Sequence, residues 1–208
     1  MRIRYMNIYQ TIQNRRSIRK FSQEHIPAEV INRLLEGMRL APSGKNAQPW
    51  KFIVVQDFTK RREIADVCVF YTSSGREIRQ DWIAEAPAII IICGDPKNAF
   101  VKILEDNRVI VANWDFLEEK QKSGPVQWES GILVDLTIPM DHLSLAALEE
   151  GLGGCWVAGL DEERLKKILD IPDDWRAPAV MPVGFPMENP EARRRKPVEE
   201  VVCFERFS

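Results

Sequence analysis

The sequence predicts a single domain in which helices pack on a β-sheet, of the α/β or α+β class. Three observations support this fold class. Helical and strand-like hydrophobic patterns alternate along the chain, and no repeat, low-complexity tract or linker divides it. Its 208 residues suffice to bury about 70% of the unfolded surface without disulfides or a structural metal. We therefore treat residues 1–208 as one domain.

The first part of the chain predicts two helices and two strands. Apolar residues at positions 30, 31, 34, 35 and 38 form one stripe of a helix that starts at Pro27 and ends before Pro42. The β-branched, apolar run at 52–55 is typical of a buried strand, and residues 57–70 predict the helix that follows it. Four isoleucines at 89–92 indicate a central strand.

Residues 95–127 lose this periodicity, and two interpretations stay open for them. They form either a mobile cap over a site or a surface excursion with small helices of its own. Apolar residues between 132 and 148 then predict a long helix, which Pro139 is expected to kink or break.

The last third of the chain returns to short elements. An apolar segment at 155–160 is followed by a helix that Asp161 is expected to cap, and residues 179–185 predict a further strand. Alternation resumes in the tail at 198–204. Because the apolar helices and the tail exceed what one small sheet can cover, we expect a dimer.

Charge and hydropathy exclude several classes of function. With 29 basic and 31 acidic residues the formal net charge is -2, so no overall basic field exists to attract nucleic acid or an anionic membrane. The longest apolar run, residues 88–93, is far shorter than the roughly 20 residues of a membrane-spanning helix. Residues 1–10 have no apolar core or cleavage site of a secretory signal. We therefore expect a cytoplasmic protein.

Neither the cysteines nor the histidines are spaced for a metal site. Cys68, Cys93, Cys155 and Cys203 form no Cys-x-x-Cys pair, and we interpret them as reduced core thiols. The two histidines, at positions 25 and 142, have no neighbouring ligand at metal-binding spacing, so no metal is expected.

Familiar catalytic motifs are also missing. The sequence contains no Gly-x-Ser-x-Gly nucleophile motif, and residues 151–156 (GLGGCW) place Trp where a dinucleotide-binding motif needs its third glycine. Carboxylate pairs such as Glu118 with Glu119, and Glu149 with Glu150, are typical of solvated helix faces. No residue therefore stands out as a nucleophile or general base.

Two basic clusters and one amide-rich loop remain as candidate binding elements. Residues 15–19 (RRSIR) and 193–196 (RRRK) each have the density of guanidinium groups that suits bidentate capture of phosphate. Singly, each is more typical of a solvated charge run, but two in an acidic protein favour a shared phosphate. Residues 41–50 (APSGKNAQPW) combine an irregular backbone with neutral donors and acceptors, which suits a heteroaromatic ring or a polyol. A plain helix-to-strand turn is the alternative for this loop.

Four motifs in order resemble the nitroreductase family of flavoproteins over nearly the whole chain. They are residues 15–21 (RRSIRKF), 41–50, 151–156 and 183–186 (VGFP), the last preceding the second basic cluster. The resemblance implies an α+β, three-layer fold with a mostly antiparallel central sheet between helices. It also implies a homodimer whose chains exchange terminal segments, with FMN bound at the interface.

The resemblance also implies roles for individual residues. Arg15, Ser17, Arg193 and Arg195 match positions that hold the FMN phosphate, with Arg16 adjacent, and Arg19 matches the basic residue near flavin N1 and the C2 carbonyl. Pro42, Ser43, Gly44, Asn46 and Gln48 match the loop that the other subunit lays against the ring and ribityl chain. Ala158 and Gly159 match the segment whose backbone amide reaches flavin N5. Some members carry an acidic residue where this chain has Ala158, but a backbone donor does not need that side chain.

The activity implied is an NAD(P)H-dependent flavin oxidoreductase. A hydride passes from NADH or NADPH through FMN to a small acceptor of the nitroaromatic or quinone class, with ping-pong kinetics. The flavin carries the chemistry, so no protein side chain is predicted to be catalytic, and Arg19 is expected to stabilise the reduced cofactor. Three alternatives stay open: reductive dehalogenation or other flavin chemistry on the same fold, a flavin-binding sensor without turnover, and nucleic-acid binding through residues 193–196.

Overall fold

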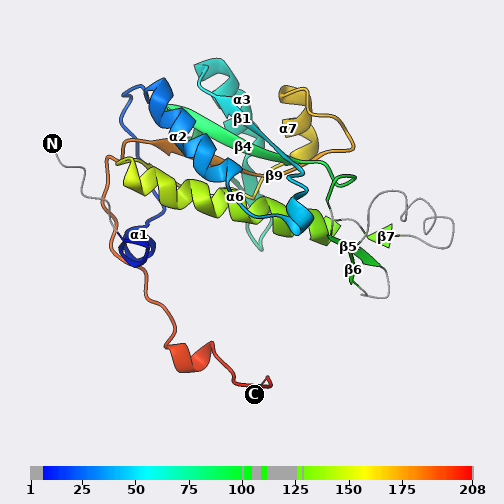
Figure 1. Cartoon of the computed structure of the whole chain (residues 1–208). Helices are drawn as coiled ribbons and strands as arrows, with labels where there is room; N and C mark the ends of the chain where they lie inside the picture. Colours follow the sequence, from blue (N-terminus) through cyan, green and yellow to red (C-terminus); the bar gives the residue numbers. More distant parts are fainter. Residues whose placement is uncertain (1–6, 100, 105–108, 112–125, 128, 208) are drawn as a thin grey trace.

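The central layer is a four-stranded antiparallel sheet in the order β1-β4-β9-β8 (Figure 1). The computed structural model describes residues 7–99, 101–104, 109–111, 126–127 and 129–207. The strands are β1 (Trp50–Val55), β4 (Ala88–Gly94), β8 (Gly153–Gly154) and β9 (Arg176–Gly184). The expected central strand at 89–92 is confirmed, since every residue of β4 is buried.

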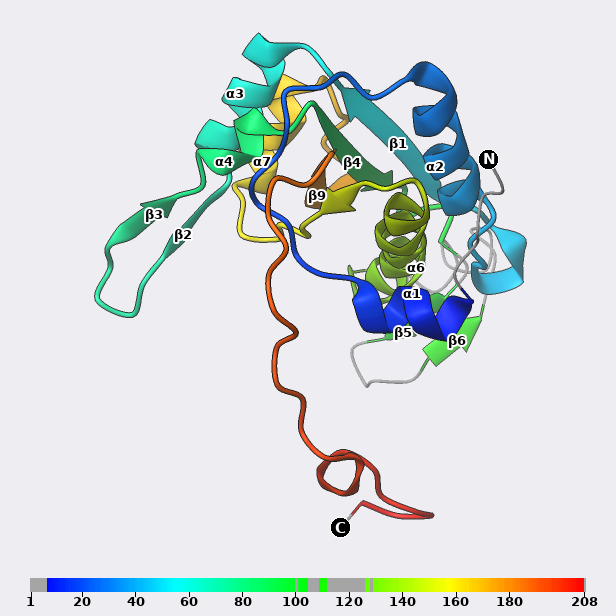
Figure 2. The same ribbon diagram turned by 90° about the vertical axis from the view of Figure 1, so that its left-hand side faces the viewer.

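Helices cover both faces of this sheet, as Figure 2 shows. On one face lie α2 (Ala28–Arg39) and α6 (Glu129–Glu149), and on the other α3 (Phe58–Val67), α4 (Trp82–Glu85) and α7 (Glu162–Ile168). Side chains of β4 alternate between the layers: Ile90 and Ile92 pack with α2 and α6, whereas Ile89 and Ile91 pack with α3 and α7. The three-layer α+β fold is therefore confirmed.

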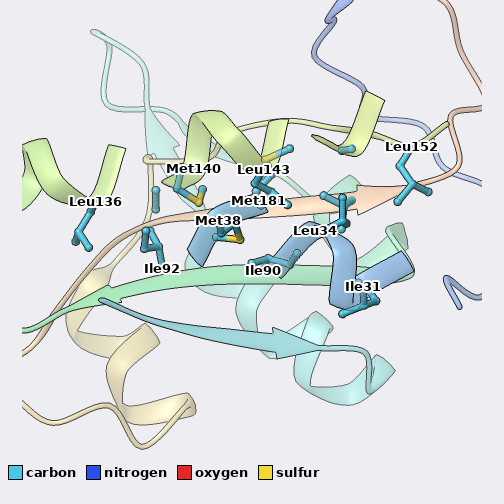
Figure 3. Packing of buried hydrophobic residues seen from close by; sticks show 14 of the residues in the cluster. Ile31, Leu34, Met38, Ile90, Ile92, Leu136, Met140, Leu143, Leu152 and Met181 are labelled. Atoms are coloured by element: carbon cyan, nitrogen blue, oxygen red, sulfur yellow. The ribbon is translucent and has the colours of Figure 1, made fainter. Parts of the chain in front are cut away.

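The core between α2, α6 and the sheet is aliphatic and contains several methionines (Figure 3). Leu34 and Met38 of α2 meet Met140 and Leu143 of α6 above Met181 of β9, and all five are at most 1% exposed. Each such side chain contributes about 1.5–3 kcal/mol through its removal from water. This packing holds α6 in place although Pro139 lies inside it.

The N-terminal elements are α1 (Ile8–Asn14) and the helix that ends before Pro42. Asn7 and Gln10 form a reciprocal capping box at the start of α1.

The side chain of Asp161 accepts the backbone N–H of Arg164, so the expected cap of α7 is confirmed. Short 3₁₀ turns occur at η1 (Gly44–Asn46) and η2 (Val198–Glu200).

One expected helix boundary is wrong. The helix expected over 57–70 ends at Val67, because residues 69–71 form β2 (Val69–Tyr71), which pairs with β3 (Glu77–Arg79) in a projecting hairpin.

Pro139 does not break α6, which continues over 21 residues because tertiary packing outweighs the lost hydrogen bond. The expected kink at Pro139 stays a prediction. In the tail, where alternation resumes, residues 198–200 form the 3₁₀ turn η2.

The segment between β4 and α6 is described only in part. Its described pieces are β5 (Val101–Leu104), β6 (Val109–Val111) and β7 (Val126–Gln127), which form a small sheet in the order β6-β5-β7. These pieces are strands rather than the small helices of the second interpretation. The role of residues 95–127 as a cap depends on residues outside the described set, so it stays a prediction.

The cysteines divide into three buried thiols and one exposed thiol. Cys68, Cys93 and Cys155 are buried and free, as expected, but Cys203 is exposed in the tail, so its assignment to the core is wrong. Burial raises the pKa of Cys68 and of Cys93 to about 12. These two thiols are therefore neutral packing groups at ordinary pH.

Candidate functional site

The two arginine clusters line one cavity of about 600 Å³. It lies between the segment that follows α1 and the segment that leads into the tail. Arginines from the two ends of the chain therefore share one space, as the phosphate hypothesis requires. The predicted binding residues that line the cavity are Arg15, Arg16, Ser17, Arg19, Arg193 and Arg195.

Glycines in β8 allow the first arginine segment to dock on the sheet. The backbone N–H of Ile18 donates to the carbonyl oxygen of Gly154 at 3.0 Å, and Ser17 pairs with the same residue as an isolated parallel bridge. A Cβ atom at Gly154 would lie 2.8 Å from the carbonyl oxygen of Pro182, closer than a carbon can approach without moving the backbone. The glycine pair at 153–154 thus positions Ser17 and the arginines on either side of it.

The second arginine segment is held alongside the first by backbone contacts. Ser22 N–H donates to the Phe185 carbonyl oxygen, and Met187 N–H donates to the Lys20 carbonyl oxygen, both at 2.9 Å. Glu188 Oε1 then accepts the N–H groups of Arg19 and Lys20 at 2.6 and 3.2 Å. These bonds direct the chain after residue 188 along the first segment and bring Arg193 and Arg195 to the cavity.

The cavity is strongly basic. Its described lining includes five arginines but a single acidic side chain, Glu191. The guanidinium of Arg19 lies over the ring of Trp82, 5.6 Å from its centroid, which orients it by a cation–π contact. Burial raises the pKa of the nearby Cys155 thiol, and the charge of Arg19 opposes this shift. A dianionic phosphate is the ligand that such a lining favours.

The loop at 41–50 has a rigid, irregular backbone. Lys45, Asn46 and Gln48 all adopt left-handed conformations, with φ of 51°, 58° and 48°. The backbone N–H of Gln48 donates to Ser43 Oγ at 2.9 Å, and its side-chain amide donates to the Asn46 carbonyl oxygen at 3.3 Å. These local hydrogen bonds hold the polar groups of the loop in a defined arrangement, and its assignment as a binding loop rather than a helix-to-strand turn stays a prediction.

Within one chain this loop lies away from the arginine cavity. Gly44 contacts Asp135 near the start of α6, whereas Leu148, near its end, lines a smaller cavity together with Arg15 and Arg16. Asp135 and Leu148 are thirteen positions apart in the helix, which corresponds to roughly 20 Å along the axis. Figure 1 shows η1 at one end of α6 and α1 at the other. One chain does not bring the two predicted binding elements together.

The predicted N5-contacting residues line a third cavity. Ala158 and Gly159 are exposed and line a cavity of about 620 Å³ beside the β2–β3 hairpin, with Tyr71 and Arg164 among its other residues. None of the arginines at 15–19 or 193–195 lines this cavity. Ala158 follows the buried Cys155 by three positions, a reach of at most about 11 Å.

Several residues that shape the site escaped the sequence analysis. Glu188 and Trp82 hold Arg19, and Asp135 holds the loop at Gly44. Of these, only Asp135 carries a signal, because it is the single charged residue within the apolar stretch 131–140. The glutamates 149 and 150 are not free helix-surface groups: they bind Thr11 of α1 at 2.5 Å and Arg33 of α2 at 2.7 Å.

Two further observations concern metal ligands and membrane-spanning segments. Among residues 7–99 and the other described segments, no cluster of three or more His, Cys, Asp or Glu side chains could hold a metal ion. One described helix segment, Gly131–Glu149, is long and apolar enough to span a membrane by composition. Its buried face packs on α2, β4 and β9, so it is a core helix of this domain.

Comparison with known proteins identifies the class. The family model for the nitroreductase family matches residues 12–185, so the chain belongs to that family. A protein named NADH dehydrogenase from Thermus thermophilus is 28% identical over 200 residues, covering 91% of this chain and 92% of the relative.

Two other similarities show how wide this family is. An iodotyrosine deiodinase from Thermotoga neapolitana is 28% identical over 184 residues, covering 86% of this chain and 88% of the relative. The solved NADPH:FMN oxidoreductase of Vibrio harveyi superposes with a TM-score of 0.74 at 24% identity, covering 98% of this chain and 79% of that chain. The fold is thus that of a nitroreductase, and the family points to an oxidoreductase.

Proposed function

We propose that this protein is an FMN-dependent oxidoreductase that takes a hydride from NADH or NADPH and passes it to a small acceptor, a nitroaromatic or a quinone, by ping-pong kinetics. The observation that carries the proposal is the basic cavity in which arginines from residues 15–19 and 193–195 meet. Family membership supports the flavin, and no side chain among the predicted site residues is an obvious nucleophile or general base.

The residues present fit FMN. The cavity of about 600 Å³ offers guanidinium groups and the Ser17 hydroxyl for a phosphate, and the loop at 42–48 offers neutral amides for a ring edge. When bound, FMN supplies a ring that accepts and releases a hydride. Arg15, Ser17, Arg193 and Arg195 would hold the phosphate, with Arg16 adjacent, and Arg19 would place a positive charge beside the ring. The exposed segment at 158–159 would donate a backbone N–H to it.

A homodimer completes this site. The loop and the arginines are at opposite ends of α6 in one chain, so a second copy must supply the loop if both contact one flavin. The tail after residue 190 leaves the body of the molecule in both views (Figures 1 and 2). Its Phe204 and Phe207 are 85% and 99% exposed, and Ile8 and Tyr9 of α1 are exposed as well. Such apolar surface is typical of a segment that packs on a partner.

Spectroscopy of the purified protein tests the proposal. The protein should bind FMN and turn yellow, and NADH or NADPH should bleach the colour rapidly without oxygen. Colour that persists with both donors would support the flavin-binding sensor instead. Failure to take up FMN would reject both functions.

Charge reversal at the cavity tests the phosphate site. Arg195→Glu should weaken FMN binding at least about 100-fold, because one charge-assisted contact is worth about 1.5–3 kcal/mol and the new carboxylate repels the phosphate. Arg194→Glu is the matched control, since Arg194 belongs to the same cluster but is absent from the cavity lining. Flavin fluorescence titration measures both affinities. Equal losses in the two variants would contradict the assignment.

Reductive dehalogenation is a second candidate reaction. It is favoured by the similarity to a protein named iodotyrosine deiodinase over 86% of this chain. A panel of acceptors presented to the reduced protein separates the two reactions. Turnover of nitroaromatics or quinones, without halide release from halogenated phenols, is the result we expect.

We further propose that the protein acts in the cytoplasm, without nucleic acid or membrane as partner. The balanced charge of the chain supports this, because it provides no overall basic field to attract nucleic acid or an anionic membrane.

A further inference from the structure

Asp135 is a buried carboxylate that the proposed reaction does not use. It lies on α6, is 3% exposed, and accepts the backbone N–H of Gly44 through Oδ1 at 3.2 Å. Within the part of the chain that the structure describes, its second oxygen, Oδ2, is buried and has no hydrogen-bond partner. Burying an ionisable group with one bond satisfied is unfavourable, so stability of the core does not account for this residue.

The pKa shift of Asp135 also indicates that an ionised carboxylate is unfavourable at this position. Burial raises the pKa of its carboxyl group above the usual range, and the hydrogen bond from Gly44 opposes the shift. A leucine of similar length would pack in the same place without that desolvation cost. The hydrogen bond that Asp135 accepts from Gly44 therefore accounts for a carboxylate at this position.

The contact with Asp135 lies at one end of a line of contacts along α6. Arg33 pairs with Glu150 at 2.7 Å, and the Gly37 carbonyl oxygen lies 3.1 Å from His142 Nδ1. Gly44 and Asp135 continue this line, so α2 and the loop after it run antiparallel to α6. Beyond Gly44 the chain leaves the helix and enters the left-handed residues 45, 46 and 48.

Left-handed conformations at three non-glycine residues are unfavourable unless the surroundings hold them. The bond from Gly44 to Asp135 fixes the position where this stretch begins, and α6 is a rigid support because its apolar face is packed in the core. Hydrogen bonds from Asn46 and Gln48 to Ser43 hold the loop internally, and the bond from Gly44 to Asp135 ties the loop as a whole to α6.

We propose that Asp135 is a positioning residue that anchors the loop at 42–48 through Gly44, so that the loop is arranged for the flavin before the flavin binds. This inference rests on the proposed function for the identity of the ligand. The anchoring itself is a property of this chain alone and is testable without a cofactor.

Three variants separate positioning from a contribution to stability. Asp135→Asn keeps an oxygen that can accept the Gly44 N–H, whereas Asp135→Leu removes the acceptor but fills the space with an apolar group. Asp135→Ala serves if leucine does not fit. Asp141→Asn is the control, because Asp141 is exposed on the same helix and loses the same charge.

FMN titration of the folded dimer gives the first readout. We expect the dissociation constant to rise about tenfold in Asp135→Leu and in Asp135→Ala, and to stay within about threefold in Asp135→Asn and in the control. The melting temperature of the apoprotein should not fall in Asp135→Leu. Weaker binding without loss of stability is a result that a merely structural role would not produce.

Amide hydrogen exchange of the apoprotein gives the second readout. Peptides that cover residues 42–48 should exchange about tenfold faster in Asp135→Leu than in the wild type, with no change in peptides from β4. Unchanged exchange in this loop, or equal loss of FMN affinity in the Asn and Leu variants, would overturn the proposal. If the wild-type chain does not bind FMN, the proposed function fails, but exchange still decides whether Asp135 anchors the loop.

Discussion

Arg19 shows how one side chain is positioned by neighbours far away in the sequence. Its backbone N–H donates to Glu188, and its guanidinium lies over the Trp82 ring. The side chain itself is exposed and lines the arginine cavity. Neither contact places a carboxylate at the guanidinium, so its positive charge is available to a ligand. Arg19 is thus the residue best placed to tune a bound flavin.

Arg19→Ala should lower the midpoint potential of bound FMN. Reduction places negative charge near flavin N1, and removal of a nearby positive charge makes that state less favourable. We expect a decrease of about 30 mV, which for two electrons corresponds to about 1.4 kcal/mol. Potentiometric titration of the flavin absorbance measures it, with Lys20→Ala as the control because Lys20 is absent from the cavity lining. An unchanged potential would show that Arg19 does not act on the ring.

At the scale of elements, Glu162 joins α7 to β9. Both of its oxygens accept bonds from Arg176, at 2.9 and 3.0 Å, and Oε1 also accepts the Ala177 backbone N–H at 2.6 Å. The Glu162 side chain is 21% exposed. Burial alone would raise the pKa of Glu162, but these hydrogen bonds and the charge of Arg176 lower it below the usual range.

Glu162→Gln should therefore reduce stability in a pH-dependent manner. A carboxyl group whose folded-state pKa is lowered contributes stability above its unfolded pKa, near 4.3, and loses this contribution as pH falls through the folded value. We expect the free energy of unfolding of the wild type to exceed that of the variant by about 1 kcal/mol at pH 7. This difference should start to shrink as pH falls below about 4.3 and should vanish only below the lowered folded-state pKa of Glu162. Urea denaturation at several pH values measures the free energies, with the exposed Glu24→Gln as control. A difference that is constant with pH would contradict this prediction.

The β2–β3 hairpin illustrates how an element can be mistaken. Val67 is buried in the core beside α4, whereas Tyr71 is exposed, so the apolar run from 67 to 71 does not lie on one helix face. The chain leaves the core after Cys68 and pairs Val69 with Arg79. The helical periodicity over 57–67 correctly predicts a helix. It does not show that the helix ends at Val67, because the change from buried to exposed surroundings depends on the fold.

At the scale of the whole molecule, the tail and the loop both point to a partner. The tail after residue 190 carries Val198, Val201 and Phe204 into solvent, although apolar side chains of this size gain from burial. The loop at 42–48 is anchored at the far end of α6 from the arginines. The homodimer that we propose would satisfy both requirements.

Removal of residues 197–208 should convert the dimer to a monomer while leaving Arg193 and Arg195 in place. We expect the sedimentation coefficient to fall to that of a single truncated chain and FMN affinity to fall with it, because the partner's loop is lost. Analytical ultracentrifugation measures the first quantity and fluorescence titration the second. The single variant Phe204→Ser should weaken association less. A truncated chain that remains dimeric would exclude the tail as the exchanged segment.

Mixed dimers test whether each site uses two chains. Arg195→Glu impairs the cavity and Gln48→Ala the loop, so each variant alone has both of its sites impaired. A dimer with one chain of each kind has one intact site, and mixing by unfolding and refolding should restore part of the FMN binding. If mixing restores none, both elements belong to one chain's site.

Periodicity predicted helices packed on a sheet because the signals of these elements are local, whereas the three-layer arrangement was implied by the family resemblance. The stripe at 30–38 requires a helix with one buried face, and the isoleucines at 89–92 require a strand buried on both faces. The expected cap at Asp161 depends on a contact three residues away, so it too follows from local chemistry. Likewise, the basic composition of residues 15–19 and 193–196 marked them as anion-binding candidates.

Contacts between distant residues could not be obtained in this way. Glu188 looks like any surface glutamate until the fold places it at the N–H groups of Arg19 and Lys20. Pro139 looks like a helix breaker, yet α6 continues through it because packing against β4 and β9 compensates for one missing bond. Such outcomes depend on which surfaces meet, and local propensity contains no information about that.

The sequence by itself determined the long strands of the central sheet and most of the helices that cover it, the family resemblance and the residue types that suit a phosphate and a heteroaromatic ring. Only the tertiary structure decided that residues 15–19 and 193–195 share a cavity, while the loop at 42–48 lies at the other end of α6. The physical reason is that hydrophobic periodicity and turn chemistry act within a few residues. Convergence of a site depends instead on how buried faces and backbone hydrogen bonds join segments more than a hundred residues apart.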